Sequence, residues 1–369
     1  MKDFIPISQP SITQKDIDYV TDAVRSGWVS SLGKYLEIFE DKFAQFAGTK
    51  HAITTANGTA ALHLALVALG IKEGDEVIIP DFTFVATANA VKYTGATVVC
   101  VDVEEGSLCI DPKCIEKAIT EKTRAIIPVH VYGHPADMVE IMKIARKHNL
   151  AVIEDAAESH GAEVLGKRVG SLADCGVFSF YGNKIITSGE GGMITTDDRD
   201  LNERIRHLRD HAMSKEKRYW HDMLGFNYRM TNLQAALGVA QLERVDEIVA
   251  RKREIFSAYR ERLCGDKRIR LNQEADWAKN VYWMVCVEIE GFGETERDLL
   301  MQRLKQKGID SRPYFYPVSD LPMYEKASTP VAHAVYQRGI NLPSYFDIED
   351  SAIGYVCDTL LGILDEMKA

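Results

Sequence analysis

A lysine that follows a predicted strand is the first residue of the sequence that could do chemistry. The strand pattern at 176–180 is followed by Lys184, and a glycine-rich turn at 189–192 comes next. A lysine just past a strand end is held at the edge of a sheet, where its amine could form a Schiff base with a carbonyl cofactor. Nearby glycines let backbone and cofactor approach closely. Taken alone, Lys184 could equally be a solvated loop lysine.

A carboxylate at a second predicted strand end suggests which cofactor this is. Asp155 follows the apolar run at 150–153, and Ala156 and Ala157 come after it. The ring of pyridoxal phosphate (PLP) needs an anion beside its pyridinium nitrogen, which keeps that nitrogen protonated and makes the ring an electron sink. The small alanines would leave room for a flat ring. The alternative is that Asp155 caps a following helix.

A helix start supplies the third feature. Asn57, Gly58 and Thr59 open an alanine- and leucine-rich segment with helical spacing that runs to residue 69. Free backbone N–H groups and the positive end of the helix dipole favour a phosphate there. Any α/β protein has several such helix starts, so this signal is weak alone. A phosphate site, a ring anion and a lysine are three separate requirements of PLP, and their combination is much more specific.

Alternating strand and helix patterns must position these residues. Helical patterns lie between several of the strands, for example at 138–148 and 200–208. This alternation predicts an α/β fold with a largely parallel sheet covered on both faces, in which ligands gather at the carboxyl ends of the strands. The predicted strands cover 77–79, 96–101, 125–131, 151–153, 176–180 and 193–196.

The last third of the chain predicts a second, smaller domain. A charged amphipathic stretch from 232 to about 262 is typical of one long helix leading into it. A strand at 281–289, a helix at 295–307 and an aromatic, proline-containing segment at 312–317 follow. We therefore predict a large domain over 1–245 and a small C-terminal α+β domain over 246–369, on which the N-terminal segment could pack.

Composition excludes several classes of protein. The 369 residues are 46% hydrophobic and 27% charged, which is typical of a soluble globular protein. A net charge of −10 argues against nucleic acid as a partner. No apolar run approaches the roughly 18 to 20 residues that cross a bilayer, and the N-terminus does not resemble a secretory signal. Seven cysteines without a CxxC pair predict reduced thiols, no metal site and a cytoplasmic protein.

Six segments match a family of known proteins over essentially the whole chain. They are Ser26-Gly27-Trp28-Val29-Ser30-Ser31, Glu154-Asp155-Ala156-Ala157-Glu158, Gly182-Asn183-Lys184 through Gly192, Lys217-Arg218-Tyr219-Trp220-His221, Asn227-Tyr228-Arg229-Met230-Thr231-Asn232 and Arg338-Gly339-Ile340-Asn341-Leu342-Pro343. The chain resembles the sugar aminotransferases of the DegT/DnrJ/EryC1/StrS family, which have the fold-type I, aspartate aminotransferase-like fold. The lysine segment identifies the family, and the segments at 217–221 and 338–343 resemble the GDP-perosamine synthase branch.

The resemblance implies a role for each matching residue. It implies that Lys184 bonds covalently to PLP, that Asp155 faces the ring nitrogen and that Phe84 stacks on the ring. It implies that Glu158 lies near the ring hydroxyl, and that Asn227 reaches the phosphate of the neighbouring subunit's cofactor in a homodimer or higher oligomer with shared sites. The implied phosphate ligands are Gly58, Thr59 and Ser179. His160 is interpreted as a structural histidine.

The resemblance also implies a reaction. An amino group would move from L-glutamate to C4 of GDP-4-keto-6-deoxy-D-mannose, giving GDP-perosamine for surface polysaccharides such as O-antigens. Cations must bind the pyrophosphate of such a substrate, and arginine suits that contact best. Ser319 stands where we expect a histidine, which leaves the identity of the substrate open. The candidate cations are Lys217, Arg218, Arg229 and Arg312.

Three alternatives remain at this point. The first is an aminotransferase acting on a UDP- or dTDP-linked 4-keto sugar. The second is a PLP-dependent dehydratase of the same fold, against which Lys184 argues because the known dehydratases of this family have histidine there. The third is a non-catalytic, regulatory member of the family, against which the retained set of Lys184, Asp155 and phosphate-site residues argues.

Overall fold

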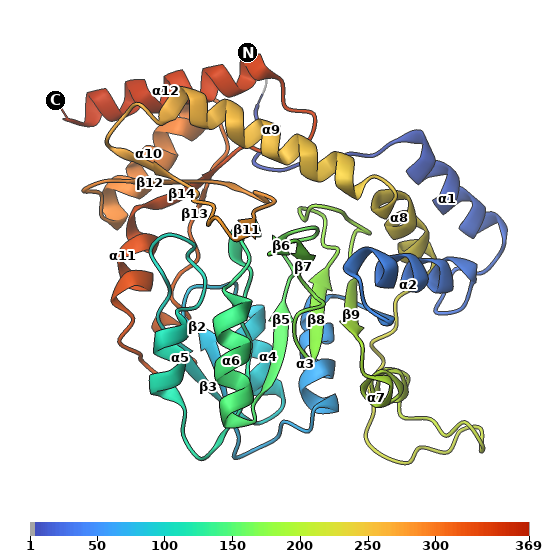
Figure 1. Cartoon of the computed structure of the whole chain (residues 1–369). Coiled ribbons are helices and arrows are strands. Elements are labelled where there is room, and N and C mark those ends of the chain that lie inside the picture. The colour runs from blue at the N-terminus through green and yellow to red at the C-terminus, as the bar shows by residue number, and fades with distance from the viewer. Residues whose placement is uncertain (1–3, 369) are drawn as a thin grey trace.

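A computed structural model describes residues 4–368 and has an α/β architecture around one large sheet (Figure 1). Within these residues the main sheet has seven strands in the order β1-β9-β8-β5-β4-β2-β3. Neighbouring strands pair in parallel except at β9, which is antiparallel to β1 and β8. The predicted, mainly parallel sheet is therefore confirmed. The strands are β1 (His51–Thr55), β2 (Glu76–Pro80), β3 (Thr97–Val101), β4 (Thr123–Ile126), β5 (Ala151–Asp155), β8 (Cys175–Ser179) and β9 (Gly192–Thr196).

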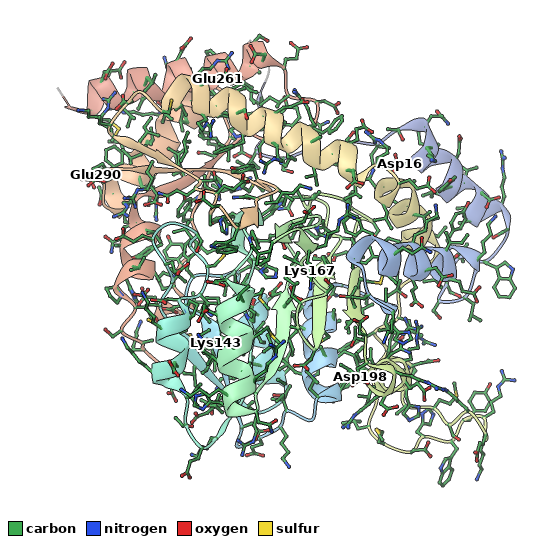
Figure 2. All side chains as sticks on the ribbon, viewed as in Figure 1. Asp16, Lys143, Lys167, Asp198, Glu261 and Glu290 are labelled. Atoms are coloured by element: carbon green, nitrogen blue, oxygen red, sulfur yellow. The ribbon has the colours of Figure 1, made fainter. Side chains whose placement is uncertain are left out.

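Helices cover both faces of this sheet. Successive side chains of a strand point to opposite faces, so a strand covered on both faces is apolar throughout. In β2, Val77 and Ile79 pack in one core with α3, α4 and α7, whereas Ile78 packs in the other core with α2, α5 and α6. The helices are α2 (Lys34–Ala47), α3 (Gly58–Ala68), α4 (Ala86–Tyr93), α5 (Pro112–Ala118), α6 (Met138–His148) and α7 (Arg199–Arg209). Charged side chains such as Lys143 on α6 point outward (Figure 2).

A second, antiparallel sheet lies in the C-terminal part of the chain. Its strand order is β10-β12-β14-β13, and helices α9, α10 and α12 share a core with it. Ile5 forms a parallel bridge with Ile309, so the N-terminal segment lies against this part. The division into domains at residue 245 stays a prediction. The elements are α9 (Val245–Leu263), β10 (Ile269–Leu271), β12 (Val285–Ile289), α10 (Glu294–Gln306), β13 (Arg312–Pro313), α11 (Pro330–Arg338), β14 (Gly339–Leu342) and α12 (Asp350–Lys368).

The prediction of one long helix over 232–262 is wrong. The stretch forms α8 (Asn232–Leu242) and α9, and Arg244 between them has non-helical backbone angles, with φ −116° and ψ 5°. The two helices pack against different partners. Helix α8 lies against α1 (Gln14–Arg25) and α2, whereas α9 lies against α12. The chain must therefore turn between them.

Three strands of the structure also differ from the prediction. β1 was not predicted, and β4 ends at Ile126, whereas the predicted strand ended at residue 131. The predicted strand at 281–289 becomes a strand only from Val285, because residues 280–284 form a turn. The side-chain oxygen of Asn280 accepts the N–H of Tyr282 at 2.7 Å and stabilises this turn.

Among the described residues, no helix is long and apolar enough to span a bilayer, and no group of three or more His, Cys, Asp or Glu side chains could hold a metal ion.

Candidate active site

One cavity of about 710 Å³ lies at the carboxyl ends of the central strands. It is lined by residues from α3, α4, the ends of β5 and β8, and the C-terminal part of the chain. Seven of the eight residues predicted to bind the cofactor meet there, although they are scattered over 127 positions of the sequence. They are Gly58, Thr59, Phe84, Asp155, Glu158, Ser179 and Lys184.

Lys184 lies on the turn that follows β8, as its spacing predicted. Its backbone N–H donates to the carbonyl of Tyr181 at 3.0 Å and closes the turn. Its Nζ lies 3.3 Å from Oε1 of Glu158 and 4.0 Å from the centroid of the Trp283 ring. Because only 12% of the side chain is exposed, the amine is held inside the cavity rather than in solvent.

Asp155 is the last residue of β5 and is buried. Its carboxylate accepts a hydrogen bond from the Thr87 hydroxyl at 2.7 Å and from the Ala157 N–H at 3.2 Å. Burial raises the pKa of Asp155, while these two hydrogen bonds and the charge of Lys184 act in the opposite direction. No helix begins at the residues that follow Asp155, so a helix-capping role does not apply.

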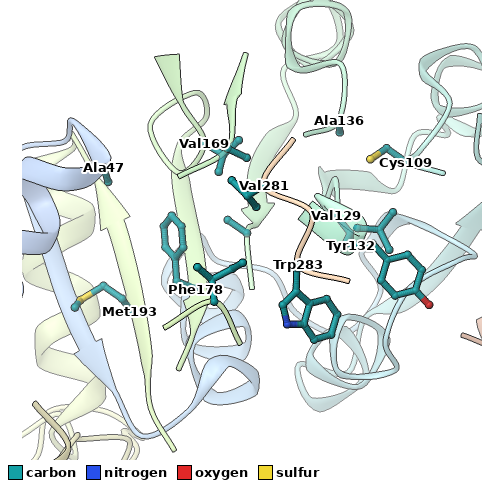
Figure 3. Packing of buried hydrophobic residues seen from close by; sticks show 14 of the residues in the cluster. Ala47, Cys109, Val129, Tyr132, Ala136, Val169, Phe178, Met193, Val281 and Trp283 are labelled. Carbon is teal, nitrogen blue, oxygen red and sulfur yellow. The ribbon is translucent and has the colours of Figure 1, made fainter. Parts of the chain in front are cut away.

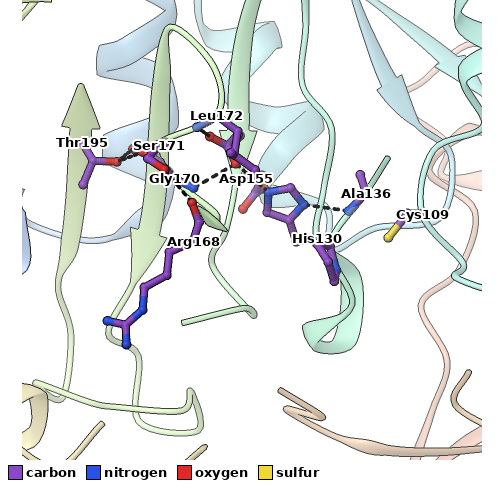
Figure 4. Close-up of polar contacts among 12 residues, drawn as sticks. Cys109, His130, Ala136, Asp155, Arg168, Gly170, Ser171, Leu172 and Thr195 are labelled. Carbon is purple, nitrogen blue, oxygen red and sulfur yellow. Dashed lines mark hydrogen bonds and ion pairs between the residues drawn. The ribbon is translucent and has the colours of Figure 1, made fainter. Parts of the chain in front are cut away.

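A buried network supports the strand that carries Asp155 from behind (Figure 4). His130 Nδ1 accepts the N–H of Ala136, so its proton is on Nε2, which donates to Glu154 at 3.1 Å. The Glu154 carboxylate also accepts the N–H groups of Gly170 and Leu172. This network fixes the end of β5 on the face opposite to Asp155.

Glu158 is a second buried carboxylate in the cavity. Its Oε2 accepts the N–H of Tyr132 at 2.8 Å, and its Oε1 faces Lys184. Burial raises the pKa of Glu158, and the positive charge of Lys184 partly opposes that shift.

The start of α3 forms a cradle that only glycine can complete. Asn57 accepts the N–H of Ala60 with its side chain and that of Ala61 with its carbonyl, which leaves the first N–H groups, those of Gly58 and Thr59, for a ligand. A Cβ at Gly58 would lie 2.9 Å from Cβ of Ser179, so the helix start and the end of β8 touch. Two N–H groups at a helix start beside a serine hydroxyl fit a phosphate. With a buried aspartate and a lysine in the same cavity, these residues fit PLP.

Five predicted residues lie outside this cavity. Asn227 is exposed, and its side-chain oxygen accepts hydrogen bonds from Arg229. Arg229 also pairs with Asp210 at 2.7 Å. Lys217 and Arg218 lie on a loop after α7 that extends from the body in Figure 1. On this loop the Lys217 amine lies over the Trp220 ring, and the Arg218 guanidinium lies over the Tyr219 ring.

Arg312 lines a neighbouring cavity of about 360 Å³, which shares Tyr181 and Asn183 with the main one. It pairs there with Asp310.

Ser319 is an interior anchor rather than a lining residue of the cavity. It is fully buried, its hydroxyl donates to Asp81 at 2.7 Å, and its N–H donates to the same carboxylate at 2.7 Å. Thr329 donates to Asp81 as well. Ser319 therefore does not line the cavity of this chain.

Several lining residues were missed by the sequence reasoning. Trp283 and Phe315 come from the C-terminal part, and Tyr181, Tyr228 and His63 complete the wall. Trp283 belongs to the segment predicted as strand, and the turn that brings it to Lys184 depends on Asn280. No sequence signal separated it from an ordinary core tryptophan.

Together, the α/β fold, the lysine after β8, the buried aspartate at the end of β5 and the phosphate cradle define a PLP-dependent enzyme of fold type I. The chain belongs to the DegT/DnrJ/EryC1/StrS aminotransferase family, whose model matches residues 10–361. It is therefore a PLP-dependent sugar aminotransferase.

Relatives and solved structures cover nearly the whole chain. The GDP-perosamine synthase of Escherichia coli O157:H7 is 45% identical over 359 residues, which is 97% of this chain and 98% of the relative. The GDP-perosamine synthase of Caulobacter vibrioides is 45% identical over 367 residues, 98% of each chain. The structure of Spr1654 from Streptococcus pneumoniae in its PLP form is 27% identical, has a TM-score of 0.94 and covers 98% of this chain and 99% of its own.

Proposed function

We propose that this aminotransferase moves the amino group of L-glutamate to C4 of GDP-4-keto-6-deoxy-D-mannose, giving GDP-perosamine and 2-oxoglutarate. The observation that carries the proposal is the 45% identity to two GDP-perosamine synthases over at least 97% of the chain. Ser319, the sequence departure that left the substrate open, is buried against Asp81 and does not line the cavity, so it does not argue against this substrate.

The proposed roles within the cavity follow from its geometry. When bound, PLP supplies an electron sink for the carbon that carries the transferred nitrogen. Lys184 holds the cofactor and moves the α-proton of glutamate, because it is the one lysine among the described residues that line the cavity. Asp155 faces the ring nitrogen, Phe84 stacks on the ring, and Glu158 lies near the ring hydroxyl. The phosphate binds Gly58, Thr59 and Ser179.

A homodimer or higher oligomer with shared sites completes the proposal. Asn227 lies outside the cavity of its own chain, and the loop before it exposes 76% of Tyr219 and 86% of Leu224, which a second copy would cover. Lys217, Arg218 and Arg229 would then meet the pyrophosphate of the neighbouring site, and Arg312 that of its own.

Mixed oligomers test the shared site. A chain with Lys184→Ala and a chain with Asn227→Asp should each be inactive alone. Co-expression should restore about a quarter of the wild-type activity, because half of the dimers are mixed and one of their two sites is intact. If Asn227 acts within its own chain, co-expression restores none.

A panel of keto sugars tests the substrate. The glutamate-treated enzyme is offered GDP-, UDP- and dTDP-linked 4-keto-6-deoxy sugars, and kcat/KM and product masses are compared. We expect the GDP sugar to be preferred by at least about a hundredfold, because another base would leave hydrogen-bonding groups of the site unpaired. Preference for another nucleotide would keep the aminotransferase and reject the GDP substrate.

A further inference from the structure

Trp283 comes from the C-terminal part of the chain, yet it packs among buried residues of the core around the main sheet (Figure 3) and lines the cavity. It belongs to the turn at 280–284, whose Val281 N–H donates to the carbonyl of Gly133 at 3.1 Å. Only 4% of Trp283 is exposed. Its ring stacks on Tyr132, with centroids 6.1 Å apart and planes 24° apart. The indole is thus held rigidly from behind.

Trp283 makes two contacts with the turn that carries Lys184. Its ring centroid is 4.0 Å from Lys184 Nζ, within the range of a cation–π contact. Its indole N–H donates to the carbonyl of Asn183 at 2.7 Å, across 100 positions of sequence. One contact is with the backbone of Asn183, and the other is with the side-chain amine of the next residue, Lys184.

The turn at 181–184 is closed by the hydrogen bond from the Lys184 N–H to the Tyr181 carbonyl, and it is packed loosely on its outer side. Tyr181 is 51% exposed, and no atom outside the immediate neighbours of Gly182 lies within 4 Å of where a Cβ would be. Lys184 Nζ contacts both the ring of Trp283, 4.0 Å from its centroid, and the carboxylate of Glu158, 3.3 Å from Oε1. A lysine that detaches from a cofactor and returns needs such a fixed resting place, because small misplacements of a reacting group slow a reaction strongly.

We infer that Trp283 is a positioning residue for the reaction. Its ring face lies against the Lys184 amine whenever that lysine is not bonded to the cofactor, and it stabilises the ammonium that forms once the neutral amine has taken the α-proton. Its N–H fixes the turn, so that Nζ stays beside the α-carbon of the bound donor. This inference rests on the proposed role of Lys184.

Two substitutions separate the ring face from the N–H group. Trp283→Phe keeps an aromatic face and loses the hydrogen bond to Asn183, whereas Trp283→Leu loses both. Trp277→Leu is the matched control, because Trp277 lies in the same part of the chain, is half-buried against His134, and does not line the cavity.

The main experiment measures the single-turnover half-reaction with glutamate and with α-deuterated glutamate. We expect Trp283→Phe to slow it about tenfold and Trp283→Leu about a hundredfold or more, with Trp277→Leu near wild type. The primary isotope effect should rise in Trp283→Leu, because movement of the α-proton becomes more rate-limiting. A merely structural role would leave the isotope effect unchanged.

A second readout uses the apo protein and needs no activity. Reductive methylation followed by peptide mapping reports how accessible Lys184 is. It should be modified several-fold faster in Trp283→Leu than in wild type or in Trp277→Leu. Wild-type kinetics in Trp283→Leu, an unchanged isotope effect, or equal losses in both leucine variants would overturn the inference. Activity in Lys184→Ala would instead overturn the proposed function.

Discussion

Substituting Gly58 by alanine tests the phosphate cradle. The new Cβ would lie 2.9 Å from Cβ of Ser179 and 3.3 Å from its hydroxyl oxygen. Contacts this short cannot persist, so the start of α3 and the end of β8 must move apart. Ser179 cannot simply rotate away, because rotation of its side chain moves the hydroxyl but leaves Cβ, the atom at 2.9 Å, in place.

The expected magnitudes differ between folding and cofactor binding. Overpacking costs about 1–3 kcal/mol, and alanine returns up to about 1 kcal/mol of helix propensity, so the apo protein should lose about 0–2 kcal/mol. Moving Ser179 away from the N–H groups of Gly58 and Thr59 should remove one hydrogen bond to a charged phosphate, which is worth about 1.5–3 kcal/mol. PLP should therefore bind roughly 10- to 150-fold more weakly.

Two assays separate these effects. Absorbance titration of the apo protein gives the affinity for PLP, and urea denaturation gives the free energy of unfolding. Gly362→Ala, in α12 with nothing within 4 Å of its Cβ, is the control that changes helix propensity alone. If Gly58→Ala bound PLP with wild-type affinity, the proposal that Gly58, Thr59 and Ser179 bind its phosphate would be refuted.

Two further predictions concern residues away from the chemistry. Ser319→Ala should lower the free energy of unfolding by about 1–2 kcal/mol, because Asp81 loses one buried donor, and should leave the KM for the sugar nucleotide unchanged. A raised KM with unchanged stability in urea denaturation would make Ser319 a substrate contact. Burial, helped by the charge of Lys184, lowers the pKa of His160 from 6.5 to about 3, so the folded state favours neutral His160 and loses stability as the pH falls below 6.5. The wild type should lose about 2 kcal/mol between pH 7 and pH 5 through this group, and His160→Phe should not, as urea denaturation at both values would measure; equal acid sensitivity would contradict the assignment.

The parts of the site that sequence predicted are those that lie close to strand ends. Lys184, Asp155 and Gly58 each sit within five residues of an apolar strand or at the start of a helix, and the carboxyl ends of parallel strands meet at one edge. The meeting of Asp155 and Lys184 in one cavity follows from the parallel pairing of β5 with β8. The apolar runs also predicted most of the strands, because burial on both faces makes each strand apolar throughout.

The parts that sequence could not predict depend on distant contacts. Trp283 reaches Lys184 only because Asn280 turns the chain before β12, and Ser319 is an anchor only because Asp81 lies at the end of β2. The break at Arg244 arises because α8 and α9 pack on different helices. Lys217 and Arg218 lie on a loop that extends from the body, away from the cavity.

Borohydride trapping with peptide mapping tests the central claim most directly. Reduction of the PLP-loaded enzyme fixes the cofactor on the lysine that holds it, and the modified peptide is identified by mass. We predict modification of Lys184, its disappearance when glutamate is added before reduction, and its return when GDP-4-keto-6-deoxy-D-mannose follows glutamate. Modification of another lysine, or modification of Lys184 that persists after glutamate, would contradict the account.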